Sequence, residues 1–170
     1  MAFKVETGAG LEDANAYGSA ADFTAYHDDR GRDTSGSTTG EIEAAIIRAT
    51  DYMDRVWTFV GQRENAVQAL EWPRIGAFFR DDGRLAGDVP REVVHACFEY
   101  AIRALDAELA PDGTYAASGG VVESKSSKLG PLSKSETLAQ GGAPIVKRSY
   151  PIADTLLREL VINGMVVRRA

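Results

Sequence analysis

The sequence has little of what disulfides and metal centres require. Among its 170 residues there is one cysteine, Cys97, and there are two histidines, His27 and His95. A single thiol excludes an intrachain disulfide and a zinc site built on cysteines. His27 precedes Asp28 and Asp29, but no second histidine or cysteine is near them, so we interpret this group as the exposed end of a helix. We therefore expect neither a metal nor a cofactor.

Long apolar runs and nucleotide-binding loops are also missing. No apolar run approaches the length of a bilayer span, and residues 1–6 lack the apolar core of a signal peptide, so we expect synthesis in the cytosol. Residues 36–40 (GSTTG) lack the lysine of a phosphate-binding loop. His95 and Glu99 are spaced for an acid–base pair, although a surface or interface hydrogen bond is the favoured interpretation. Because the sequence shows no combination of a nucleophile, a base and an orienting group, we expect that the protein is not an enzyme.

Charge is distributed unevenly along a chain whose net charge is −6. Between residues 123 and 148 five basic residues oppose two acidic ones, a local charge of +3 that leaves −9 for the rest: Lys125, Lys128, Lys134, Lys147 and Arg148 against Glu123 and Glu136. The lysines are interpreted either as solvated residues that protect a strand edge or as an arm that meets an acidic partner or DNA phosphate. The acidic remainder argues against a protein that coats nucleic acid.

Two capping patterns predict the first two helices. Ser19 with Asp22 begins a helix over about 19–30, and Thr38 with Glu41 begins another that ends near residue 57. In the second helix, apolar residues recur at steps of four and three and form one stripe: Ile42, Ile46, Ala49, Met53 and Val56.

A third helix is predicted over about 90–109, with Pro90 at its first position. Its polar residues form one narrow stripe in which Glu99 and Arg103 are spaced for an ion pair. A helix that is apolar over so much of its surface lies either at the centre of a bundle or partly at a subunit interface. The irregular segment before it, 58–89, is expected to be held by a structural anchor: Trp72, Pro73 and Arg74.

Glycine-rich joints separate the last part of the chain. Two strands, about 121–128 and 132–138, are predicted to form a protruding hairpin. A last helix is predicted over about 151–162, before an apolar and then basic tail at 163–170.

The expected fold is mainly α: a small bundle of about four helices with a protruding β-hairpin and extended N- and C-terminal arms. Its parts are an N-terminal arm (1–18), a helical core domain (19–111), a flexible joint carrying the hairpin arm (112–150), and a C-terminal helix and tail (151–170).

Four stretches of the chain resemble one family, the head–tail connector (adaptor) proteins of long-tailed phages. They are residues 5–17 (VETGAGLEDANAY), 45–54 (AIIRATDYMD), 68–74 (QALEWPR) and 89–93 (VPREV). The resemblance covers roughly residues 5–110, and the order of the pieces is more specific than any one of them. Some relatives in this group carry a label that likens them to a DnaT-type single-stranded-DNA-binding protein.

This resemblance implies a virion subunit that forms a ring of about twelve copies between the capsid portal and the tail. Its expected partners are itself, the portal protein, the next neck or tail-terminator protein, and the genomic DNA passing through the ring. The alternative is a single-stranded-DNA-binding (DnaT-like) replication accessory protein.

Two surfaces are expected to make these contacts. The portal-binding residues would be those of the last helix and tail: Ile152, Leu156, Leu157, Leu160, Val161, Met165, Val166, Val167, Arg168 and Arg169. The hairpin would contact the channel, a neighbouring subunit or the next neck protein through Lys125, Lys128, Leu129, Leu132 and Lys134.

Overall fold

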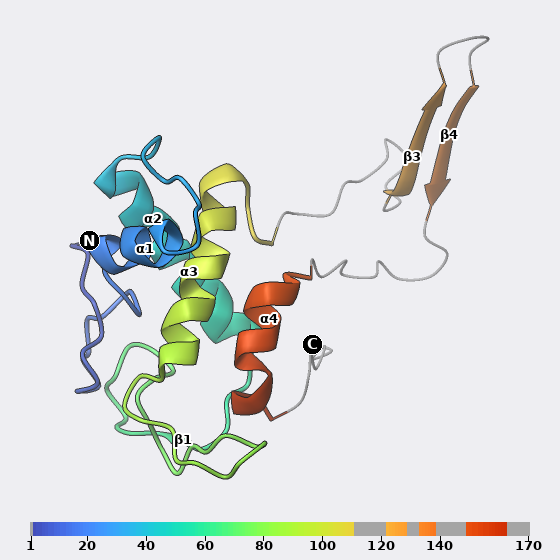
Figure 1. Cartoon of the computed structure of the whole chain (residues 1–170). Helices are drawn as coiled ribbons and strands as arrows, with labels where there is room; N and C mark the ends of the chain where they lie inside the picture. The colour runs from blue at the N-terminus through green and yellow to red at the C-terminus, as the bar shows by residue number, and fades with distance from the viewer. Residues whose placement is uncertain (1, 111–121, 129–132, 139–148, 163–170) are drawn as a thin grey trace. The chain divides into compact units, whose positions relative to one another are not determined.

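The computed structural model describes residues 2–110, 122–128, 133–138 and 149–162. The chain forms two compact units, Met1–Leu109 with Ser149–Ala170, and Ala110–Arg148, and each is described by itself. The described residues of the first unit form four helices, the last followed by a 3-10 turn: α1 (Ala20–Asp28), α2 (Thr39–Val56), α3 (Arg91–Asp106), α4 (Pro151–Leu157) and η1 (Arg158–Leu160) (Figure 1). This confirms the mainly helical fold. None of the helices in the described ranges is long and apolar enough to cross a membrane.

Both predicted helix starts are confirmed. The Ser19 hydroxyl accepts from the Asp22 N–H at 3.1 Å. At the start of α2 the Thr38 hydroxyl accepts from the Glu41 N–H at 3.3 Å, and the Glu41 carboxylate accepts from the Thr38 N–H at 2.7 Å. These contacts satisfy backbone donors that a helix leaves unpaired in its first turn. Of the predicted apolar stripe of α2, Ile42, Ile46, Ala49 and Met53 are buried in the core and Val56 is partly buried against it.

Helix α3 lies at the centre of the first unit. Figure 1 shows α1 on one side of α3 and α4 on the other, with α2 crossing behind α3. Its buried residues cover most of its circumference: Val93, Ala96, Cys97, Phe98, Glu99, Tyr100, Ala101 and Ala104. The wide apolar surface is therefore explained by a central position in the bundle. Pro90 is the N-cap of α3 and lies one position before the expected place.

The N-terminal segment is extended and packs against the helices. The carboxylate of Glu6, which is 5% exposed, accepts hydrogen bonds from the N–H groups of Gly8, Gly10 and Leu11 at 2.9–3.0 Å. Gly10 has φ +66°, and a Cβ there would lie 2.2 Å from the Asn65 side chain. The turn therefore requires glycine at that position, and it holds residues 2–18 on the body.

The segment between α2 and α3 contains two short strands, β1 (Gln62–Arg63) and β2 (Arg74–Ile75), paired antiparallel. The expectation of a wholly irregular segment is corrected to this extent. Trp72 is fully buried with its ring edge-to-face on Phe59 at 5.7 Å, and the Trp72–Pro73 peptide bond is cis. The Arg74 guanidinium donates to backbone carbonyl groups of residues 59–61. These three residues thus hold the segment against the helices.

Helix α4 is shorter than predicted. It ends at Leu157, and after η1 the chain becomes extended, with Val161 bridged antiparallel to Phe59. The Val60 N–H donates to the Leu160 carbonyl and the Ile162 N–H to the Thr58 carbonyl, each at 2.9 Å. This pairing with a segment about a hundred residues earlier in the chain replaces the last turn of the expected helix.

The second unit contains β3 (Val122–Lys128) and β4 (Ser133–Leu138), which pair antiparallel with Lys125 opposite Glu136 and Lys128 opposite Ser133. Both strands lie within one residue of their predicted starts, so the hairpin prediction is confirmed. Apart from Val122 and Leu138 the two strands carry only polar residues. A two-stranded ribbon without apolar residues to bury is only marginally stable by itself. The predicted joints at 112–120 and 140–144 lie outside the described residues.

Candidate functional site

A buried ion pair joins α1, the loop after it and α3. Glu99 is only 3% exposed, although the sequence placed it on a polar surface stripe. Its carboxylate accepts from the Tyr26 hydroxyl at 3.0 Å and from Arg32 Nη1, which lies 2.8 Å from both oxygens. The expected pair between Glu99 and Arg103 is not formed. A buried carboxylate is tolerated when it is paired and hydrogen-bonded, and here the partners come from about 70 residues away.

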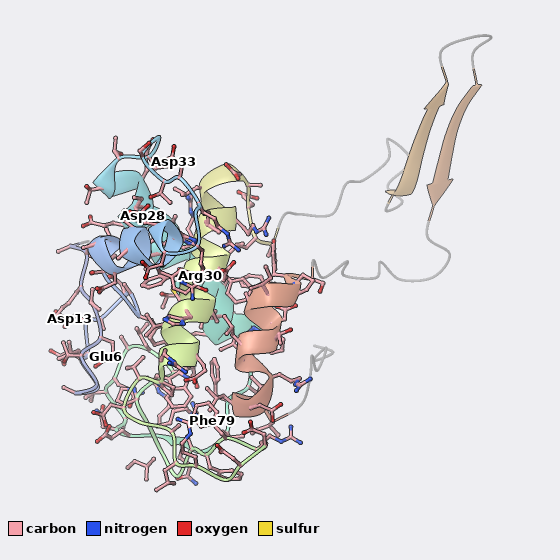
Figure 2. The ribbon with its side chains drawn as sticks, in the orientation of Figure 1. Glu6, Asp13, Asp28, Arg30, Asp33 and Phe79 are labelled. Atoms are coloured by element: carbon pink, nitrogen blue, oxygen red, sulfur yellow. The ribbon has the colours of Figure 1, made fainter. Side chains whose placement is uncertain are left out.

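Guanidinium and aromatic groups stack beside this ion pair. The Arg30 guanidinium (Arg30 is labelled in Figure 2) lies over the Tyr26 ring, 3.4 Å from its centroid. The His95 ring lies 4.6 Å from the same ring. Burial, and then the nearby charges of Arg30 and Arg91, lower the pKa of His95. His95 is therefore neutral at physiological pH and serves as a packing surface.

His27 occupies a different place from the one the sequence indicated. It is fully buried under α3, and its Nε2 lies 3.2 Å from the Phe98 carbonyl oxygen. Burial lowers the pKa of His27, so the ring is held neutral and Nε2 donates this hydrogen bond. Asp28 and Asp29 are exposed, whereas His27 is buried, so the three side chains do not form one site. Within the described ranges no three His, Cys, Asp or Glu side chains are grouped so that they could hold a metal ion.

A cavity of about 380 Å³ opens between α3 and the start of α4. It is lined by Glu99 and Arg103 of α3 and by residues 149–153. Ile152 is 49% exposed, and Arg103 has no ion-pair partner among the described residues. Since Arg32 already neutralises Glu99, the cavity offers an apolar surface beside one available guanidinium. These groups suit an apolar side chain accompanied by a carboxylate.

The walls of this cavity are held in place by hydrogen bonds. Tyr100 donates to the Asp154 carboxylate at 2.6 Å, and the Tyr150 N–H donates to the same carboxylate at 3.1 Å. The Tyr150 hydroxyl donates to the Leu109 carbonyl at 2.8 Å. Burial and the bond to Asp154 raise the pKa of Tyr100 well above its usual range, so it remains a donor. The start of α4 is therefore firmly joined to α3.

A second exposed apolar surface lies on the loop between β2 and α3. Phe78 and Leu85 face each other across an antiparallel bridge and are 45% and 73% exposed, while Phe79 between them points into the core. We call residues 78–85 the loop tip; its turn carries Asp81 and Asp82. The sequence analysis missed this surface, although apolar residues on both sides of an Asp-Asp-Gly turn are a signal for it.

The loop tip is fixed to the end of the α4 segment. The Arg80 N–H donates to the Glu159 carbonyl at 3.2 Å, and its guanidinium donates to the Val161 carbonyl at 3.2 Å. Arg84 lies over the Phe79 ring, 3.9 Å from its centroid (Phe79 is labelled in Figure 2). The carboxylate of Asp81 has no cationic partner among the described residues. The tip thus presents two apolar side chains and one available carboxylate.

The residues expected to bind a portal fall into three groups. Leu157, Leu160 and Val161 are at most 1% exposed, so in the folded subunit they belong to the core and not to the surface. Ile152 is exposed and Leu156 is half-buried. The remaining five, Met165 to Arg169, lie outside the described residues. Three buried side chains at the end of the last helix are explained by its pairing with residues 58–60.

The hairpin residues are placed only by their position in the strands. Lys125 and Lys128 belong to β3 and Lys134 to β4, with Lys134 opposite Ser127. Leu129 and Leu132 lie outside the described residues.

Comparison with known proteins gives a family. Residues 1–170 match the family described as "Putative DnaT-like ssDNA binding protein". No curated protein and no solved structure is significantly similar to the chain. Because the match covers the entire sequence, the chain belongs to this DnaT-like family.

Proposed function

We propose that the protein is a structural virion subunit, a head–tail connector that forms a ring under the portal, passes the genome and joins the capsid to the tail. The observation that carries this proposal is the presence of exposed apolar side chains at both ends of the α4 segment. Ile152 lies at its start, and Phe78, Leu85 and Ile162 lie near its end, each at least 45% exposed. Separate apolar surfaces on one subunit are typical of proteins that hold a partner on each side.

The charge of the body also fits a subunit that surrounds DNA. Residues 2–110 and 149–162 carry 12 lysines and arginines against 22 acidic residues, a formal charge of −10. An acidic wall repels the phosphate backbone, so a duplex passes without adhering to it. A protein that binds single strands instead offers exposed aromatic rings in a basic groove. Among the aromatic residues in the described ranges, only Phe78 is exposed.

Portal docking is proposed for the tail, residues 163–170. The tail follows Ile162, whose backbone is fixed to the body through the Thr58 carbonyl and whose side chain is 49% exposed. Its sequence, apolar at Met165 to Val167 and basic at Arg168 and Arg169, combines an apolar anchor with charges that complement an acidic surface.

Deletion of residues 163–170 is expected to abolish binding to the portal and to leave the helical fold intact. The measurement is a pull-down with purified portal, with circular dichroism as the control for folding. Unchanged binding by the truncated chain would contradict this role of the tail.

The hairpin is proposed to contact the channel, a neighbouring subunit or the next neck protein. Its strands are polar along nearly their whole length, so it has no apolar face with which to join a core. Such an element gains its order from an assembly, where the new interface offsets the cost of fixing it.

The first experiment is native mass spectrometry with negative-stain imaging of the protein alone and mixed with its portal. A ring, alone or added to the portal, is the expected result and gives the copy number. A chain that stays monomeric and ignores the portal would exclude the connector function.

A second candidate function is the binding of single-stranded DNA, which the description of the family names. One observation favours it: Arg91, His95 and Arg103 recur at multiples of four residues along one side of α3, with Arg30 beside His95. If this function is correct, fluorescence anisotropy should show binding of an oligonucleotide that weakens steeply with salt, because neutralised phosphates release counterions. A connector should show no such binding by its body.

A further inference from the structure

The loop tip and the cavity have complementary chemistry. The tip presents Phe78 and Leu85 side by side. At its turn the Asp81 carboxylate accepts from the Asp82 N–H and has no cationic partner among the described residues. The cavity presents Ile152 beside the guanidinium of Arg103, which has no ion-pair partner in the described part of the chain. The apolar wall and guanidinium of the cavity therefore match the apolar pair and carboxylate of the tip.

The two surfaces cannot meet within one subunit. The cavity is built on residues 149–153, at the start of α4. The tip is fixed to Glu159 and Val161, beyond its end. From Ile152 to Glu159 the chain runs along the rest of α4 and into the 3-10 turn, a rise of about 12 Å that both flanking contacts hold rigid. The surfaces therefore face outward at opposite ends of one element.

We propose that copies of this chain join head to tail, with the loop tip of one copy seated in the cavity of the next. Phe78 and Leu85 then pack on Ile152, and the Asp81 carboxylate pairs with Arg103. Two different surfaces form the contact, so each copy retains one free tip and one free cavity. Such a heterologous interface generates a closed ring when the rotation between copies closes. This inference rests on the proposed ring function and identifies the surfaces that build the ring.

Disulfide trapping between two separate chains tests the contact directly. One full-length chain carries Leu85→Cys and the other Ile152→Cys, and the mixture is oxidised under conditions of ring assembly. The native Cys97 does not interfere, because it is fully buried and burial raises the pKa of its thiol to about 12. The matched control replaces Leu85→Cys with Val67→Cys, which is 67% exposed on another loop.

The expected result is a cross-linked heterodimer from the Leu85→Cys and Ile152→Cys mixture, at about tenfold the yield of the control pair or more. An equal yield from both mixtures would overturn the interface.

Charge exchange provides a second measurement. Asp81→Arg and Arg103→Glu should each lower self-association by about tenfold, because each places like charges together. The two variants mixed should recover it in heterodimers, where an Arg at position 81 meets a Glu at position 103. Arg91→Glu, on the first turn of α3, is the matched control and should have no effect. Singles that still associate normally, or a mixture that does not recover, would overturn the interface.

The outcomes separate this inference from the connector function. Rings that form with wild-type protein and persist in both charge variants exclude the interface and leave the connector function standing. Absence of rings from wild-type protein, with and without portal, excludes the connector function; a specific cross-link would then still support the head-to-tail contact.

Discussion

Ionisation of Asp54 should weaken the helical body as the pH rises. Asp54 lies on α2, where its carboxylate accepts from the Tyr17 hydroxyl at 2.7 Å and from the Glu71 N–H at 3.0 Å. Burial raises the pKa of Asp54 from 3.8 to about 6, although these two hydrogen bonds act in the opposite direction. The charges of Glu71 and Asp51 raise the pKa further. The folded state therefore binds this proton more tightly than the unfolded chain does.

The magnitude follows from the shift. A rise from 3.8 to about 6 corresponds to about 3 kcal/mol, at about 1.4 kcal/mol per pKa unit. The sign is set by which state holds the proton. Well below pH 3.8 both states are protonated and the full contribution is present; it is lost progressively as the pH rises from 3.8 through about 6. Above that pH the folded protein contains a buried charge that only two hydrogen bonds compensate.

The perturbation is Asp54→Asn, which removes the titration and retains the shape of the side chain. The free energy of unfolding of both proteins is measured by urea denaturation between about pH 4 and pH 8. The wild-type value minus the variant value should fall by about 2.5 kcal/mol over this range, because part of the full contribution is already lost at pH 4. Taking the difference cancels the titration of all other groups. A difference that is constant, or that rises with pH, would show that hydrogen bonding outweighs burial at this carboxylate.

Two further predictions concern packing and the buried ion pair. Gly18→Ala should destabilise the body by about 1–3 kcal/mol, because a Cβ there would lie 2.5 Å from the Phe98 ring. Gly40→Ala is the control and should be neutral or stabilising, because the space around Gly40 is open. Equal effects of the two variants in thermal denaturation would contradict this packing. Arg32→Ala should cost about 2 kcal/mol by leaving the carboxylate of Glu99 buried without its cation, a value reduced because Arg32 itself is 32% exposed. Adding Glu99→Gln should recover part of that loss, and a double variant as unstable as the single one would contradict the electrostatic cause.

The helix starts and the hairpin could be predicted because their signals are local. The hydroxyl groups of Ser19 and Thr38 bond to N–H groups three residues later, so capping is visible in short stretches of sequence. The strands at 122–128 and 133–138 were likewise marked by a change in composition and by the Gly130-Pro131 pair between them.

The errors concern residues whose partners are distant in sequence. Glu99 and His27 looked like surface residues, but their partners lie 67 to 73 positions away, and no spacing within one helix shows them. The end of the last helix was wrong for the same reason, since residues 160–162 pair with the backbone of 58–60. The cavity was missed because residues 99–103 and 149–153 meet only in the folded chain. The loop tip has a local turn signal, but the exposure of Phe78 and Leu85 depends on how the segment packs on the body.

By itself the sequence determined the helical class, the places where helices begin, the two strands and the resemblance to a family, because propensity, capping and apolar periodicity act within a few residues. Tertiary structure alone decided which polar residues are buried, which apolar residues remain exposed, and that two complementary surfaces lie at opposite ends of α4. Those properties depend on which segments come together. Only in the folded chain does a buried charge meet its distant partner, and only there is it decided which apolar side chains stay exposed.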